Sequence, residues 1–194
     1  QQGFDFLLMA AIPMLIGGWI LAEPAVVAIG QAAYAPAAPT LRLLLIAVVA
    51  LFLNSLSGHV VTIVNRQRQM VWGYLAVAAI GVVAYLKLIP AFSLTGAAIG
   101  TIITESLTGI IGYILLWRVL KIRLNFSRLP KILLAAAVMG GLTWALRGAN
   151  FWLTVLAAST VYGVMLLLTR AVTTQTVKDI IIAPPTSPTS LPTE

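Results

Sequence analysis

The sequence has no cysteine, only one histidine and only five acidic residues among its 194 residues. The absence of cysteine excludes disulfide bonds, thiolate metal sites and cysteine nucleophiles. The single histidine, His59, has no second histidine and no nearby acid with which to form a metal site. Paired carboxylates and catalytic triads are also missing. We therefore expect a protein that is not an enzyme and that uses no metal and no cofactor.

Charged residues are scarce and apolar residues are abundant. Only 9% of the residues are charged and 60% are hydrophobic, whereas soluble domains carry about a quarter of charged residues. A membrane span needs about 20 mostly apolar residues, so this length holds about six spans joined by short loops. The composition therefore predicts an all-α integral membrane protein with six transmembrane helices.

Six apolar runs are delimited by polar and turn-forming residues. The expected spans cover approximately residues 6–29, 40–64, 70–88, 96–117, 132–146 and 151–169. In the first run, Pro13 and the Gly17–Gly18 pair are expected bend points, and Glu23–Pro24 marks the far end. The segment KLIPAFSLTG is expected to form a turn-rich connection, and RGAN a tight hairpin.

The net charge of +7 does not indicate nucleic-acid binding, because the lysines and arginines punctuate apolar runs instead of clustering on a water-facing surface. Nine lie on one side of the expected topology: Arg66, Arg68, Arg118, Lys121, Arg123, Arg128, Lys131, Arg170 and Lys178. Arg42, Lys87 and Arg147 lie on the other side. The positive-inside rule therefore places both termini in the cytoplasm. The basic segment 121–131 either lies on the anionic inner leaflet or only sets the orientation.

An acidic residue, Glu105, lies near the middle of the apolar run GAAIGTIITESLTGIIGYILLW. A carboxylate at that depth costs about 2.5–3.5 kcal/mol on insertion scales. Thr101, Thr104, Thr108 and Gly112 share one helical face with Glu105. The hydroxyls of Thr101 and Thr108 are expected to act as donors to the carboxylate. The opposite face is expected to meet lipid and carries Ile99, Ile102, Ile103, Leu107, Ile110 and Ile111.

The Glu105 face has two interpretations. In one, Glu105 lines a hydrated cavity and exchanges a proton or cation; in the other, its carboxyl group joins two helices. A second polar face, formed by Asn54, Gly58, Thr62 and Asn65, favours the hydrated interior. Arg42, at the outer end of that span, is expected to meet a phosphate, to pair with Glu23 or to extend to the interface. The candidate substrate or ion pathway thus comprises Glu105, Thr101, Thr104, Thr108, Asn54 and Arg42.

Three segments together resemble the C-terminal region of the bacterial polysaccharide exporters of the MOP superfamily. They are IPMLIGGWILAEPAVVAIGQAAYAPAAPTLRLL, the polar span ending in NRQRQ, and LIPAFSLTGAAIGTIITE. The resemblance extends over residues 4–121 and is firmest in the loop 30–34 leading to Leu41–Arg42 and in IPAFSLTGAA at 89–98. Members of this family are flippases for lipid-linked oligosaccharides, related to the lipid II flippase and to multidrug MATE transporters.

The resemblance implies two lobes of helices around a cavity that opens alternately to the two sides of the bacterial inner membrane. The substrate would be a lipid-linked glycan whose lipid tail stays in the bilayer. Family members usually have a dozen or more spans, so we expect this chain to be part of a longer protein whose N-terminal lobe is missing here. A multidrug or cation antiporter of the same superfamily, and a non-transporting scaffold subunit of polysaccharide assembly, are the alternatives.

This comparison also divides the chain into three parts. Residues 1–122 are expected to form a four-helix region of the C-terminal lobe, and 123–170 an additional transmembrane hairpin with a basic cytoplasmic linker. Residues 171–194 form a tail rich in proline, serine and threonine. Such a composition cannot bury enough apolar surface to fold, so the tail is expected to be disordered in the cytoplasm.

Overall fold

The computed structural model of the protein describes residues 2–63, 67–120 and 127–169, and every regular element in these ranges is a helix. This confirms the predicted all-α class. The elements are α1 (Gln2–Gly30), a 3-10 helix η1 (Ala32–Ala37), α2 (Ala38–Ile63), α3 (Gln67–Leu120), α4 (Leu129–Ala145) and α5 (Phe151–Leu168). The predictions of an inner-leaflet segment at 121–126 and of a disordered tail at 171–194 lie outside the described residues.

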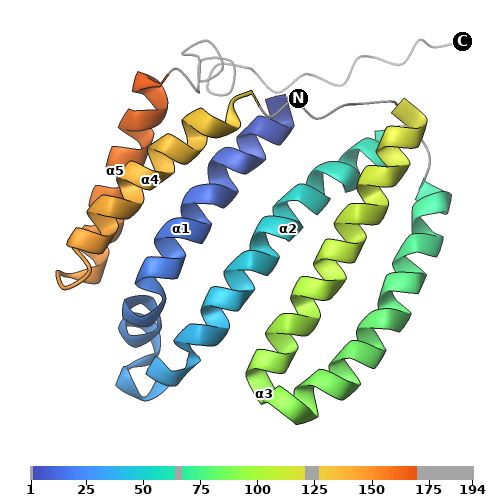
Figure 1. The fold of residues 1–194 in the computed structure, drawn as a ribbon, viewed down its shortest axis with the longest axis horizontal. Helices are drawn as coiled ribbons and strands as arrows, with labels where there is room; N and C mark the ends of the chain where they lie inside the picture. Colours follow the sequence, from blue (N-terminus) through green and yellow to red (C-terminus); the bar gives the residue numbers. More distant parts are fainter. Residues whose placement is uncertain (1, 64–66, 121–126, 170–194) are drawn as a thin grey trace, which may run out of the picture.

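The helices stand side by side in a curved row (Figure 1). Helix α1 packs against α2, α4 and α5, whereas α3 packs against α2. Four stretches are long and apolar enough to cross a membrane: Gly3–Gly30, Ala32–Ser55, Met70–Arg118 and Phe151–Leu168. Helix α4 is a shorter apolar helix. Length and composition thus indicate a membrane-embedded protein.

Helix α3 folds back on itself at Ser93, where the backbone takes non-helical angles of φ 51° and ψ −126°. Its two legs, 67–92 and 94–120, run side by side (Figure 1). The connection predicted from Lys87 to Gly96 is therefore wrong in length, because the helix continues through Pro90. A proline removes only its own backbone donor, and this one lies in the last turn before the chain reverses.

The reversal at Ser93 brings the two legs of α3 into close contact. A side chain at Gly96 would overlap the backbone carbonyl of Leu88, so the turn accepts only glycine at that position. Further along, the Tyr85 hydroxyl and Thr101 Oγ1 are 3.1 Å apart and share a hydrogen bond between the legs. The legs therefore form a tight helical hairpin.

Helix α1 is longer than the predicted first span. It runs unbroken from Gln2 to Gly30 with Pro13 and Pro24 inside it, so the expectation that Glu23–Pro24 marks its far end is wrong. The proline ring is compatible with helical φ, and each proline costs the helix one backbone hydrogen bond. The connection to α2 is largely the 3-10 helix η1, which follows Gln31 at φ 69°.

The expected hairpin at RGAN joins α4 to α5. Asn150 caps α5 by accepting hydrogen bonds from the backbone N–H groups of Trp152 and Leu153, at 3.0 and 3.4 Å. The hairpin packs against α1 through a buried apolar cluster that includes Phe4, Leu8, Ile12, Ile132, Ala135, Ala136, Met139, Ala158 and Tyr162. At one end of this cluster, Arg128 pairs with the buried Asp5 at 3.4 Å. The first helix therefore packs with both predicted parts, 1–122 and 123–170.

The close approach at Gly96 gives a direct test of the α3 reversal. Gly96→Ala is expected to lower the free energy of unfolding by about 1–3 kcal/mol, the usual cost of an overpacked site. Gly141→Ala on α4 is the matched control, because an added methyl group there meets no atom within 4 Å. Thermal unfolding of the detergent-solubilised protein measures both. Equal stability of the two variants would contradict the reversal.

Candidate functional site

Asn54 on α2 and Glu105 on the second leg of α3 meet in the structure, although 51 residues separate them. The Asn54 Nδ2 donates to the Glu105 carboxylate oxygen Oε2 at 2.8 Å and to the Glu105 backbone oxygen at 2.8 Å. Both side chains are half-buried. A charge-assisted hydrogen bond of this kind is roughly twice as strong as a neutral one. Two of the predicted pathway residues therefore form one interhelical contact.

The other amide atom of Asn54, Oδ1, is buried and has no hydrogen-bond partner within the described residues. It lies against Gly109, where an added Cβ would be only 2.5 Å away. Helix α2 can approach α3 at this point because residue 109 has no side chain. The pairing of Asn54 with Glu105 thus depends on a glycine one helical turn further along α3.

The threonine hydroxyls near Glu105 bond to their own helix. Thr101 donates to the Ala97 carbonyl at 3.0 Å, and Thr108 donates to the Thr104 carbonyl at 2.8 Å. Thr104 donates to the carbonyls of Gly100 and Thr101, at 3.1 and 3.0 Å. The expectation that Thr101 and Thr108 supply donors to the carboxylate is therefore wrong. Hydroxyls in a helix commonly bond back to the preceding turn, and here the donor comes from Asn54.

The predicted single polar face divides between two neighbours. Thr101 contacts Tyr85 of the first leg, whereas Glu105 contacts Asn54 of α2. The predicted lipid face is correspondingly only partly exposed. Ile110 is 54% exposed, but Ile111 packs beside a buried cluster of Val61, Met70 and Leu116, so its assignment to lipid is wrong. The second leg has neighbours on two sides, and these cover more of its circumference than one face.

Arg42 is not part of this contact. Its Nε donates to the Trp19 carbonyl of α1 at 3.2 Å. Since Arg42 precedes Asn54 by twelve positions on α2, the two lie about 18 Å apart along the helix axis. Arg42 therefore binds α1, and the expected pairs with Glu23 or with a pathway phosphate do not describe its contact. Of the second polar face, the Thr62 side chain and Asn65 lie outside the described residues.

Two tyrosines were missed by sequence reasoning. Tyr85 bonds to Thr101, as described above, and Tyr162 on α5 donates to the Met9 carbonyl of α1 at 2.9 Å. The signal that could have found Tyr162 is Pro13, because a proline in a helix leaves the carbonyl four residues earlier without its usual donor. The sequence does not show which helix supplies a replacement.

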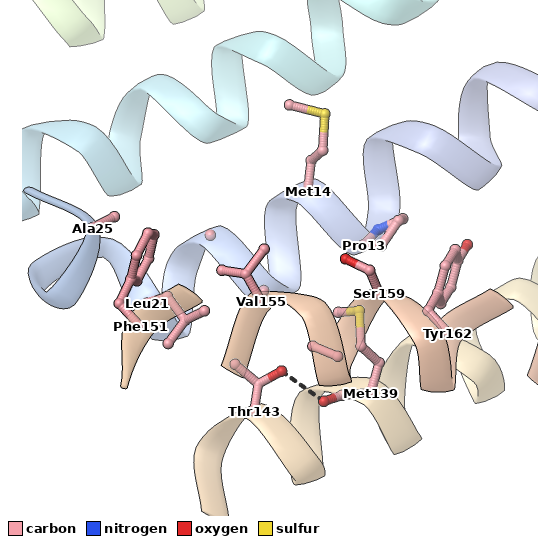
Figure 2. A pocket seen from close by; sticks show the side chains of 13 residues that line it. Pro13, Met14, Leu21, Ala25, Met139, Thr143, Phe151, Val155, Ser159 and Tyr162 are labelled. Carbon is pink, nitrogen blue, oxygen red and sulfur yellow. Dashed lines mark hydrogen bonds between the residues drawn. The ribbon is translucent and has the colours of Figure 1, made fainter. Parts of the chain in front are cut away.

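A cavity of about 360 Å³ lies between α1, α4 and α5 (Figure 2). Its walls are mostly apolar, with Thr143, Ser159 and Tyr162 as polar members. The Thr143 hydroxyl is bonded to the Met139 carbonyl at 2.8 Å. Neither Glu105 nor Asn54 lines this cavity. The polar contact and the cavity are therefore separate features, on opposite sides of α2 and α1 respectively in the row of helices.

Across the described ranges, no group of three or more histidine, cysteine, aspartate or glutamate side chains is placed to hold a metal ion. No family model, curated protein or solved structure matches this chain. The interhelical contact of Asn54 and Glu105 is therefore the candidate site on geometry alone: a carboxylate held by an amide between two apolar helices.

The close contact of Asn54 with Gly109 predicts a coupled pair of mutations. Gly109→Ala is expected to lower the free energy of unfolding by about 1–3 kcal/mol, because the new methyl group displaces the Asn54 amide. Asn54→Ala removes the displaced group, so the double variant should lose less stability than the sum of the two single losses. Gly163→Ala, which meets no atom within 4 Å, is the control. Strictly additive losses in thermal unfolding would show that the two residues do not touch.

Proposed function

We propose that this chain is part of a flippase that moves lipid-linked oligosaccharide or polysaccharide precursors across the bacterial cytoplasmic membrane by alternating access. In this proposal both legs of α3 and the shorter α4 cross the bilayer, so the chain contributes six spans. A further N-terminal lobe supplies the other wall of the cavity. The resemblance of residues 4–121 to polysaccharide exporters supports the assignment of the substrate class.

The observation that carries the proposal is the Asn54–Glu105 contact within apolar helices. Glu105 lies twelve positions after Ser93, about 18 Å along the second leg, and so near the middle of a hydrocarbon core of about 30 Å. Transporter sites concentrate at this depth. A carboxylate retained there is expensive and is usually functional.

In the proposed mechanism Glu105 takes up and releases a proton or cation as the cavity opens to either side. Asn54 donates a charge-assisted hydrogen bond to the ionised carboxylate, and neutralisation of the carboxylate weakens that bond. The charge of Glu105 is thereby linked to the strength of the α2–α3 contact. A transporter needs such a link, because a bound ion shifts a conformational equilibrium only if it interacts differently with the two states.

A second candidate is a non-transporting scaffold subunit of polysaccharide assembly. The same hydrogen bond favours it, because polar side chains that bond across membrane helices also stabilise static packing. The cation antiporter remains the third alternative. All three assign a contact to Glu105, but only the two transporters require its charge to change.

Glu105→Gln separates these functions, because glutamine keeps a side-chain oxygen for Asn54 and cannot ionise. In the full-length protein we expect normal membrane levels and glycolipid export lowered about 5- to 150-fold, the range of typical coupling free energies. Glu23→Gln is the matched control, because Glu23 is exposed and lies outside the site. Export should be measured over a range of pH. Undiminished export by a well-expressed Glu105→Gln variant would leave only the scaffold role.

The proposed orientation places both termini in the cytoplasm and the α4–α5 hairpin outside. Gly148 in this hairpin is exposed and has open space around it, whereas exposed Arg118 lies at the opposite end of α3. We expect Gly148→Cys in intact cells to react with a membrane-impermeant maleimide, and Arg118→Cys to react only after permeabilisation. The chain has no other cysteine to react. Labelling of Arg118→Cys from outside would reverse the topology.

A further inference from the structure

The continuity of α1 depends on a side chain from another helix. Pro13 has no backbone N–H, so the Met9 carbonyl lacks its usual donor within the helix. The Tyr162 hydroxyl of α5 supplies the replacement, at 2.9 Å and from 153 residues away. Tyr162 is only 8% exposed, so water does not readily replace it. A helix interrupted in this way bends most easily at the proline.

The two halves of α1 on either side of Pro13 have different surroundings. The first half is held tightly, because Phe4, Leu8 and Ile12 belong to the buried cluster with α4 and α5 and Asp5 pairs with Arg128. The second half borders the cavity of about 360 Å³, whose α1 lining consists of Pro13, Met14, Gly17, Gly18, Leu21 and Ala25. There is therefore room for movement beside the second half of α1.

Pro13 and Tyr162 lie together at one end of this cavity, and Leu21, Ala25 and Phe151 lie at the other (Figure 2). The interrupted backbone position and its replacement donor thus occupy the boundary between the packed half of α1 and the half with free space. A bend at Pro13 would carry the second half of α1 across the cavity.

On its other side, the second half of α1 is attached to α2. Leu45 packs so closely against Gly18 that an added Cβ would lie 2.8 Å from it, and Arg42 donates to the Trp19 carbonyl at 3.2 Å. The adjoining end of α2 therefore moves together with the second half of α1. A movement at Pro13 changes the position of α2 relative to α4 and α5.

We propose that Pro13 is a hinge in α1 and that Tyr162 is the latch that holds it. While the Tyr162 hydroxyl is bonded to Met9, the second half of α1 stays apart from α5 and the cavity is open. When the bond breaks, residues 14–30 swing toward α4 and α5 together with the attached end of α2, and the cavity narrows. This device does not rest on the proposed function, because its movement can be measured without transport.

Spin-label distances test the hinge in the full chain reconstituted in lipid vesicles. The outer pair is Ala28→Cys with Leu153→Cys, and the inner pair is Gly3→Cys with Leu134→Cys; all four positions are exposed. The chain has no native cysteine to label. With Tyr162→Phe, which removes only the hydroxyl, we expect a second and shorter population of outer distances. The inner distances should stay unchanged.

Pro13→Ala provides the matched control, because alanine restores the backbone donor to the Met9 carbonyl. We expect one outer population in Pro13→Ala, whether residue 162 is tyrosine or phenylalanine. If Tyr162→Phe does not fold but the double variant does, the hydroxyl is needed only because of Pro13, which supports the hinge.

Four results would overturn the proposal. The outer distances might be unaffected by Tyr162→Phe, or the inner and outer pairs might broaden together, as in general loosening. The second population might persist in the double variant. Failure of the double variant to fold would show that the hydroxyl serves another purpose.

Discussion

A backbone carbonyl inside an apolar helix bundle must be paired, because hydrocarbon offers it no water. Three side chains of this protein donate to backbone carbonyls of a neighbouring helix: Tyr162 to Met9, Arg42 to Trp19 and Asn54 to Glu105. These bonds join α5 to α1, α2 to α1, and α2 to α3. Each step along that part of the row thus contains one polar side chain that reads the backbone of the next helix.

Glycines allow these polar contacts to form at close range. Lipid chains are as apolar as leucine, so membrane helices associate through close packing and small residues instead of through the hydrophobic effect. Leu45 of α2 lies against Gly18 of α1, Ile16 of α1 lies against Gly140 of α4, and the Asn54 amide lies against Gly109 of α3. The spacing of the row is therefore set by positions without side chains, and the polar bonds select its register.

The row contains two joints that differ in chemistry. Between α2 and α3, Asn54 bonds to an ionisable side chain, so the contact depends on charge. Between α1 and α5, Tyr162 bonds to a carbonyl left free by Pro13, so the contact controls a bend and not a charge. Helix α2 takes part in the first joint and is attached to the moving half of α1 in the second. A change at one joint therefore reaches the other through a single helix.

The sequence by itself determined the helical class, the positions of the apolar runs, the α4–α5 hairpin and the unusual status of Glu105 and Asn54. It did so because length, hydropathy and turn residues are local properties. Only the tertiary structure decided that Glu105 meets Asn54, that Thr101 meets Tyr85, that Ile111 is packed and that Arg42 lies apart from the site. Periodicity defines the faces of one helix but not the neighbour that each face meets. In a membrane protein, residues that face lipid are as apolar as residues that face another helix, so the pattern that orients a helix in water is absent here.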